Sequence, residues 1–276
     1  MRRHFVHFLW GSLLAILGVI TVFFISVWNG WVGYMPNMDE LSNPIDKFAS
    51  QVYSSDQQLI GTWNADNNNR VAIDYNGLSP DLVHALVATE DERFYEHSGV
   101  DFIALGRAVV KRGVMGQASA GGGSTITQQL AKQLFSEKAH STVERLLQKP
   151  IEWIIAVKLE RHFTKEEILA MYFNYFDFLH NAVGIKRAAN VYFNKEPRKL
   201  TVTEAAMLVG LCKNPSMFNP LRYPERCKQR RNVVLMQMVK SGYVTKAEYD
   251  ELSQRPLGLH FTKAKPVSGA ADYFQA

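Results

Sequence analysis

The residues that could do chemistry fall in three short stretches of the chain. The first is "ATEDERFYEHSGVD", in which Glu90 and Asp91 close an otherwise apolar helical pattern. A carboxylate held among apolar side chains loses solvation, and such a group is suited to act as a general base or acid. Two simpler interpretations stay open: Glu90 could be a solvated residue at a helix end, and His97 could be a packing residue.

The second stretch is "GGGSTITQQLAKQLF", residues 121–135. A glycine-rich loop that leads into a helix offers free N–H groups and the positive end of the helix dipole, so it is a natural site for an anion. Thr125 and Gln128 match a capping box, which explains part of the polarity without any ligand. Capping does not explain Gln129 and Lys132, which lie three residues apart on one face of the predicted helix.

The third stretch is "QKPIEWIIAVKLE", in which Pro150 is predicted to begin a helix with Glu152 in its first turn. An acidic residue there can simply stabilise the helix dipole, by about 0.3–1 kcal/mol. However, the neighbours of Glu152 are apolar, and burying a carboxylate costs several kcal/mol unless a cation or hydrogen bonds compensate. The pattern therefore favours a second acid that faces a site, whereas Glu160 is interpreted as structural.

An apolar segment near the amino terminus predicts a membrane anchor. Residues 8–28, "FLWGSLLAILGVITVFFISVW", contain no charge, and about twenty apolar residues span a bilayer as a helix. The segment is longer than the apolar region of a cleaved signal peptide and offers no small-x-small cleavage site. Because Arg2 and Arg3 precede it, the amino terminus is expected in the cytoplasm and the rest of the chain on the outer, periplasmic face. A buried core helix is the alternative.

Composition sets the remaining bounds. The 276 residues are 47% hydrophobic, enough for one substantial core with a small second lobe, and the disordered and collagen-like classes are excluded. A net charge of +5 suits phosphates or an anionic membrane. No arginine-rich run or zinc-finger spacing is present, so no nucleic acid partner is expected. Cys212 and Cys227 are interpreted as unpaired thiols, although a bridge is geometrically possible.

These patterns divide the chain into four parts. Residues 1–30 form the cytoplasmic tip and anchor, and 31–74 a linker with a short β segment made of "SQVYSSDQQLIGTW" and "RVAIDY". Residues 75–245 form a mostly α domain, and 246–276 a second linker. Within the domain one helix follows the N-cap Ser79, and the others are expected at 102–112, 125–135, 152–161, 165–175, 184–193, 203–211 and 224–240.

Five segments, taken in order, carry a family resemblance. They are "EDERFYEHSG", "GGSTITQQLAKQLF", "KPIEWIIAVKLE", "KEEILAMYFN…AVGIKRAANVYF" and "LTVTEAAMLVGLCKNPSMFNP". They resemble the five motifs of the family 51 glycosyltransferases, the peptidoglycan polymerases of monofunctional transglycosylases and of class A penicillin-binding proteins. The resemblance covers about residues 75–240, with Gln148 and Ala170 in place of the usual arginine and glutamate.

The resemblance implies a fold and a reaction. The fold would be mostly α and lysozyme-like, with a membrane-dipping small lobe at 101–120. The enzyme would polymerise lipid II outside the membrane: a sugar 4-hydroxyl attacks the anomeric carbon of the growing chain, the configuration inverts and undecaprenyl pyrophosphate leaves. The expected partners are lipid II, the lipid-linked glycan chain, the membrane and cell-wall synthesis proteins. Moenomycin, which mimics the donor, is expected to inhibit.

The resemblance also implies residue roles. Glu90 would be the general base, and Glu152 would act catalytically near the donor pyrophosphate and its divalent cation, Mg²⁺ or Mn²⁺, as a metal ligand. The predicted substrate-binding residues are Asp91, Arg107, Ser124, Thr125, Gln128, Gln129, Lys132 and Lys149.

Two other functions stay open. A lysozyme-like, glycan-cleaving hydrolase would have no anionic leaving group, so Lys132 and Arg107 would lack a purpose. A non-catalytic, membrane-anchored scaffold of the same fold would need no base.

The chain has no Ser-x-x-Lys and no Lys-Thr-Gly, the marks of a transpeptidase. We expect the front part of a class A protein that continues into such a domain, with a complete monofunctional enzyme as the alternative.

Overall fold

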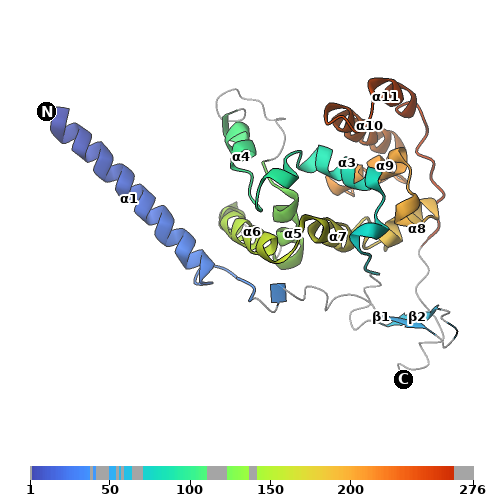
Figure 1. Cartoon of the computed structure of the whole chain (residues 1–276), viewed down its shortest axis with the longest axis horizontal. Helices are drawn as coiled ribbons and strands as arrows, with labels where there is room; N and C mark the ends of the chain where they lie inside the picture. The colour runs from blue at the N-terminus through green and yellow to red at the C-terminus, as the bar shows by residue number, and fades with distance from the viewer. Residues whose placement is uncertain are drawn as a thin grey trace.

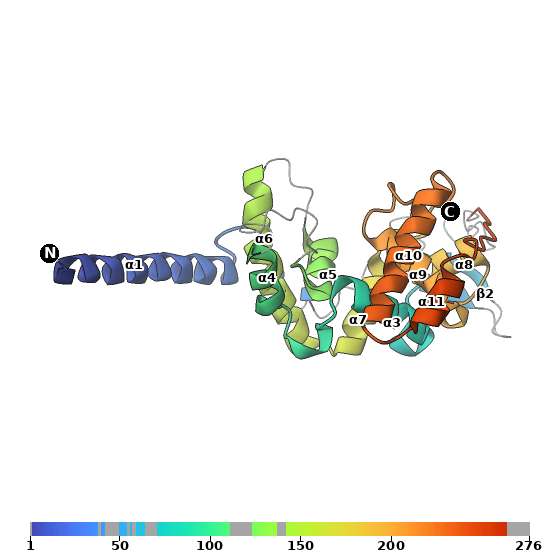
Figure 2. The same ribbon diagram turned by 90° about the horizontal axis from the view of Figure 1, so that it is seen from above.

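The structure is a computed structural model, and it describes residues 2–37, 40–41, 50–53, 56, 59–63, 71–110, 123–136 and 142–263. The described chain is mostly helical, which confirms the predicted fold class. Figure 1 shows one long helix that projects from a group of shorter helices. In Figure 2, α4, α5 and α6 lie on the side of this long helix, and α9, α10 and α11 lie on the far side.

The long helix, α1 (Arg2–Trp28), has the length and composition of a membrane span. The most apolar part of its segment Arg3–Trp28 has a mean hydropathy of 2.5 and is not buried against the rest of the chain, whereas Val27 near its end is buried. Its last turn contacts α6 (Thr142–His162). The ring of Phe24 stacks on Trp153 with centroids 6.4 Å apart, and Lys158 Nζ lies 5.0 Å from the ring centroid of Trp28. The anchor therefore joins the domain at α6.

The predicted β segment exists, but its strands lie elsewhere. β1 (Ser50–Tyr53) and β2 (Leu59–Trp63) pair antiparallel, so both strands come from "SQVYSSDQQLIGTW". The expectation of a strand in "RVAIDY" was wrong for the described residues 71–75. The side chain of Asn174 bonds both the N–H of Ile73, at 3.1 Å, and its carbonyl, at 2.8 Å, so this backbone is satisfied by a helix rather than by a partner strand.

Two sets of helices build the core. α3 (Pro80–Glu90) packs against α9 (Val202–Cys212) and α10 (Pro224–Lys240), and α5 (Ile126–Phe135) packs against α6 and α7 (Lys165–Tyr175). α9 lies at the centre, since every residue from 204 to 212 is buried. The other short elements are α4 (Phe102–Val109), α8 (Ile185–Phe193), η2 (Tyr75–Gly77), η3 (Phe94–Glu96) and η5 (Pro197–Lys199).

Most helix ends follow their capping residues. Ser79 and Thr125 cap α3 and α5 as predicted, and α7 and α10 have the predicted bounds. The prediction for α6 was wrong, because this helix begins at Thr142 and carries Pro150 in its interior. An internal proline costs roughly 3 kcal/mol. The packing of α6 against both α5 and α1 offsets that cost, and local sequence does not reveal such packing.

The described part of the predicted second linker is also packed. α11 (Lys246–Leu252) starts at a capping box of Thr245 and lies against α10. Beyond it, the chain runs along α8: the N–H of His260 donates to the Tyr192 carbonyl at 2.9 Å, and that of Thr262 to Val191 at 2.8 Å. The packed domain thus continues past residue 245, and residues 264–276 lie outside the described chain.

The predicted small lobe is described only in its first half, which holds α4. The side chains of Phe102 and Ile103 are 71% and 62% exposed on this helix, and residues 111–120 lie outside the described chain. Exposed apolar side chains of this size fit a membrane surface, and insertion of the lobe stays a prediction.

Cys212 and Cys227 are both free and buried, which confirms the interpretation as unpaired thiols.

Candidate active site

A cavity of about 220 Å³ opens where α3 ends. Its wall includes Glu90 at the end of α3, Arg107 on α4, Ser124 and Thr125 before α5, and Gln237 on α10. Four elements that are distant in sequence therefore converge on one space. Glu90, Arg107 and the end of the glycine-rich loop, three of the features singled out in the sequence, therefore line the same cavity.

Glu90 lines this cavity, and its carboxylate has one partner on each of its two oxygens. The Gln129 side chain donates from Nε2 to Glu90 Oε2 at 2.9 Å. On the other oxygen, Arg230 Nη2 lies 3.6 Å from Glu90 Oε1. The Glu90 side chain is 17% exposed, so it is largely desolvated but still reaches the cavity. A carboxylate fixed in this way can accept a proton from a bound hydroxyl.

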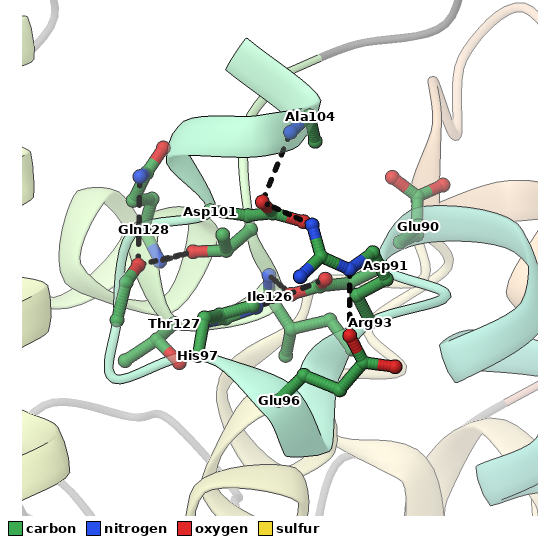
Figure 3. Close-up of polar contacts among 12 residues, drawn as sticks. Glu90, Asp91, Arg93, Glu96, His97, Asp101, Ala104, Ile126, Thr127 and Gln128 are labelled. Carbon is green, nitrogen blue, oxygen red and sulfur yellow. Dashed lines mark hydrogen bonds and ion pairs between the residues drawn. The ribbon is translucent and has the colours of Figure 1, made fainter. Parts of the chain in front are cut away.

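Asp91 has a different environment from Glu90. Its side chain is 4% exposed and accepts from the N–H of Ile126 at 3.0 Å. The ring Nε2 of His97 lies 3.0 Å from the same oxygen. Figure 3 shows these contacts together, with the carboxylate of Glu90 directed away from them. Asp91, predicted to bind substrate, borders the cavity but uses its carboxylate to tie the end of α3 to the start of α5.

Two backbone N–H groups at the start of α5 already donate hydrogen bonds to side chains of the protein. Besides the Ile126 N–H bonded to Asp91, the N–H of Gln128 donates to Thr125 Oγ1 at 3.1 Å. The expected capping box is only half formed, because the buried Gln128 Oε1 accepts no hydrogen bond, while Nε2 donates to the carbonyl of Gly99 at 3.4 Å. Thr125 Oγ1 donates to the same carbonyl at 2.6 Å. Two N–H groups expected to be free for an anion are thus occupied, and the buried side chain of Gln128 contacts Gly99.

Gly99 is required at this junction. Its φ is +92°, and a Cβ there would lie 2.7 Å from the backbone carbon of Ala156 on α6. The carbonyl that holds Thr125 and Gln128 therefore comes from a residue that must be glycine. This contact fixes α5 against α6, the two helices that carry Gln129 and Glu152.

Glu152 is not among the residues that line this cavity, and its partner is Lys149. Lys149 Nζ is 2.6 Å from Glu152 Oε2 and 3.4 Å from Ser124 Oγ, so it links the buried acid to the cavity wall. The Glu152 side chain is 3% exposed, whereas that of Lys149 is 43% exposed. The ammonium is therefore the group of this pair that solvent or substrate reaches. Lys132, predicted nearby, is exposed on α5 one turn after Gln129.

The part of the chain that the structure describes does not form a ready metal site. No three His, Cys, Asp or Glu side chains gather there to hold an ion. Glu152, the predicted metal ligand, already pairs with Lys149 at 2.6 Å. One buried carboxylate beside an ammonium is a poor donor set for a divalent cation, which needs several oxygens. We therefore assign no step to a protein-bound metal.

Sequence reasoning missed Arg230 and Gln237. Burial lowers the pKa of the Arg230 guanidinium, and the negative charge of Glu90 acts in the opposite direction. Arg230 and Gln237 lie seven residues apart on α10 and share one face, which would have been a usable signal. The neighbouring Arg231 is structural, because it donates to the carbonyls of Ser253 and Pro256.

Comparisons with known proteins show the family of the chain. Residues 56–239 match the family described as Transglycosylase. Penicillin-binding protein 1A of Aquifex aeolicus is 37% identical over 96% of this chain and 34% of its own length. The Escherichia coli protein of the same name is 37% identical over 87% of this chain and 27% of its own length. A crystal structure of Haemophilus influenzae penicillin-binding protein 1A aligns over 79% of this chain and 22% of that one, with 24% identity and a TM-score of 0.42.

The chain thus spans about a third or less of the curated relatives it matches. The family match, however, covers well over half of the chain, from before α3 to the end of α10. It includes Glu90, the glycine-rich loop and the residues of α6 around Glu152. The chain therefore belongs to the transglycosylase family.

Proposed function

We propose that this protein is a peptidoglycan glycosyltransferase that joins lipid II units into glycan strands with inversion at the anomeric carbon. The observation that carries the proposal is Glu90 at the cavity wall, held by Gln129 and Arg230, with the cationic Arg107 lining the same cavity. A polymerase of this kind needs a base for the acceptor hydroxyl and positive charge for a pyrophosphate leaving group.

Glu90 acts as the general base. The acceptor 4-hydroxyl gives its proton to a carboxylate oxygen of Glu90 as the oxygen bonds to the anomeric carbon. The N–H of Gln129 fixes one carboxylate oxygen at 2.9 Å, and this limits the orientations of the group. Such preorganisation lowers the cost of reaching the transition state, because the base need not reorient.

The leaving group is stabilised from the other side. As the bond to the anomeric carbon breaks, undecaprenyl pyrophosphate gains negative charge. Lys149 and Arg107 supply positive charge there, and Lys132 on α5 adds a third cation for the lipid-linked phosphates. Glu152 acts by holding Lys149, whose ammonium lies between this acid and Ser124. This is a catalytic role on the pyrophosphate side that needs no proton transfer by Glu152.

A divalent cation, Mg²⁺ or Mn²⁺, enters with the substrate in this proposal. Magnesium is commonly held by one or two carboxylates together with phosphate oxygens and water. The pyrophosphate and water would supply most of the ligands, and Glu152 would supply at most one, because one of its oxygens pairs with Lys149.

The anchor and α4 set the location of the reaction. α1 is long and apolar enough to cross a membrane, and it joins the domain at α6, the helix that carries Glu152 and Lys149. The lipid tail of the substrate keeps the pyrophosphate at the membrane surface. We propose that the amino terminus is cytoplasmic, that the domain works on the outer face, and that cell-wall synthesis proteins are its partners.

The test is the incubation of the detergent-solubilised chain with labelled lipid II. We expect muramidase-sensitive glycan, one undecaprenyl pyrophosphate for each bond formed, and inhibition by moenomycin. Cleavage of preformed glycan without polymerisation would instead indicate the lysozyme-like hydrolase. A folded protein that neither builds nor cleaves glycan would indicate the scaffold.

A further inference from the structure

A hydrogen-bonded chain leads from Glu90 into the core. Gln129 Nε2 donates to Glu90, and Gln129 Oε1 accepts from the hydroxyl of Tyr172 at 3.1 Å. Tyr172 lies on α7 and is completely buried, so it makes no contact with solvent or with the cavity. The thiol of Cys212, on α9, lies beside its hydroxyl.

We propose that Tyr172 is a positioning residue for the general base, acting through the side-chain amide of Gln129. The inference rests on the proposed function, since it gives Tyr172 a role only if Glu90 accepts the proton.

The side-chain amide of Gln129 can lie in two orientations between Glu90 and Tyr172. A glutamine amide can turn by 180°, which exchanges its oxygen and its nitrogen. In the flipped orientation the amide oxygen would face the carboxylate of Glu90, and two acceptors would repel each other. The carboxylate of Glu90, which only accepts, favours the orientation with Nε2 towards it, and in that orientation the Tyr172 hydroxyl donates to the amide oxygen Oε1. The hydroxyl thus stabilises the orientation in which an N–H of Gln129 meets the base, because it gives the buried amide oxygen its partner.

Burial makes this donor permanent. Desolvation raises the pKa of Tyr172 well above its ordinary value, and the negative charge of Glu90 acts in the same direction. The hydroxyl therefore keeps its proton over the whole range in which the enzyme could work. Burial likewise raises the pKa of the Cys212 thiol, which stays neutral beside it.

The test is Tyr172→Phe in the full chain, which keeps the ring and removes only the hydroxyl. We expect kcat for lipid II polymerisation to fall about tenfold, equal to about 1.4 kcal/mol, with KM changed by less than about twofold. The matched control is Tyr192→Phe, which removes another buried tyrosine hydrogen bond, to the carbonyl of Phe178 at 2.7 Å. This control should lose a similar amount of thermal stability and keep the wild-type kcat.

A double-mutant cycle tests the route through Gln129. In a Gln129→Leu background, adding Tyr172→Phe should lower kcat by less than about twofold, because the group through which Tyr172 acts is gone. A full tenfold effect in that background would overturn the proposal. So would a Tyr172→Phe enzyme with the kcat of the wild type or of the Tyr192→Phe control.

A measurement without substrate separates this inference from the proposed function. With ¹⁵N-glutamine labelling, the side-chain NH₂ signals of Gln129 are assigned by their loss in Gln129→Leu. They should shift in Tyr172→Phe and stay in place in Tyr192→Phe. A folded wild type that makes no glycan would overturn the proposed function. Unchanged Gln129 signals in Tyr172→Phe would overturn the positioning role, whatever the activity.

Discussion

Replacing Asp91 by asparagine tests whether this acid supports the fold or binds substrate. The carboxylate is 4% exposed and holds the N–H of Ile126 and the ring of His97, each at 3.0 Å. Asparagine keeps one acceptor oxygen and turns an NH₂ towards one of these two partners. A buried hydrogen bond to a charged group contributes about 1.5–3 kcal/mol. We therefore expect the free energy of unfolding to fall by about 2–3 kcal/mol for Asp91→Asn.

For a domain of this size, 1 kcal/mol corresponds to about 2–4 °C, so Tm should fall by about 4–12 °C. Circular dichroism melting in detergent measures this fall. The matched control is Asp250→Asn, because Asp250 is exposed and pairs with Lys246 at 2.7 Å on the surface of α11, where such a pair contributes little. If Asp91→Asn melted like the wild type but lost polymerisation completely, the structural role would be refuted and substrate binding supported.

Three further predictions concern other parts of the domain. Arg230→Gln removes the cation 3.6 Å from Glu90 and should lower kcat about 10- to 100-fold, with partial recovery in Arg230→Lys. Steady-state kinetics measures this, and wild-type kcat in both variants would contradict it. Gly99→Ala should cost about 1–3 kcal/mol in a melting experiment, since φ is +92° and the new Cβ meets Ala156, and an unchanged Tm would refute the close approach. Burial raises the pKa of Cys227 from 9.0 to about 12, so its stability contribution is complete below pH 9 and is lost as pH rises towards 12. Cys227→Ala should flatten the alkaline decline in unfolding free energy by about 1.4 kcal/mol per pH unit, and an equal slope in both proteins would contradict the buried thiol.

Local signals predicted those elements whose ends are set by their own residues. Thr164 and Glu167 form a capping box before α7, and the predicted and observed bounds of this helix agree. The observed start of α6 differs from the predicted one because its internal proline is tolerated where other helices pack against it. Those helices come from elsewhere in the chain, so the local sequence does not indicate them. The backbone at Ile73 differed for the same reason, since its hydrogen bonds go to Asn174, about a hundred residues later.

The site divides in a similar way. The motif residues Glu90, Gln129 and Glu152 could be selected from the sequence because acids among apolar residues and an unexplained polar helix face are local patterns. The partners of these residues could not be selected from one sequence. Tyr172 reaches Gln129 through helix packing across the core, and nothing in its own neighbours indicates it. The spacing of Arg230 and Gln237 indicates a shared face of α10, but it does not indicate that this face meets Glu90. Asp91 was selected from its motif as a substrate-binding residue, but in the structure its carboxylate accepts a hydrogen bond from the backbone of Ile126.

The most direct test of the central claim compares lipid II polymerisation by the wild type and by Glu90→Gln. The substitution keeps the size of the side chain and removes the base, so we expect polymerisation to fall by about 10²–10⁴-fold with the melting curve nearly unchanged. Glu166→Gln, at an exposed position of α7, is the matched control and should polymerise like the wild type. Wild-type activity in Glu90→Gln would contradict the account, because the proton would then be taken by another group.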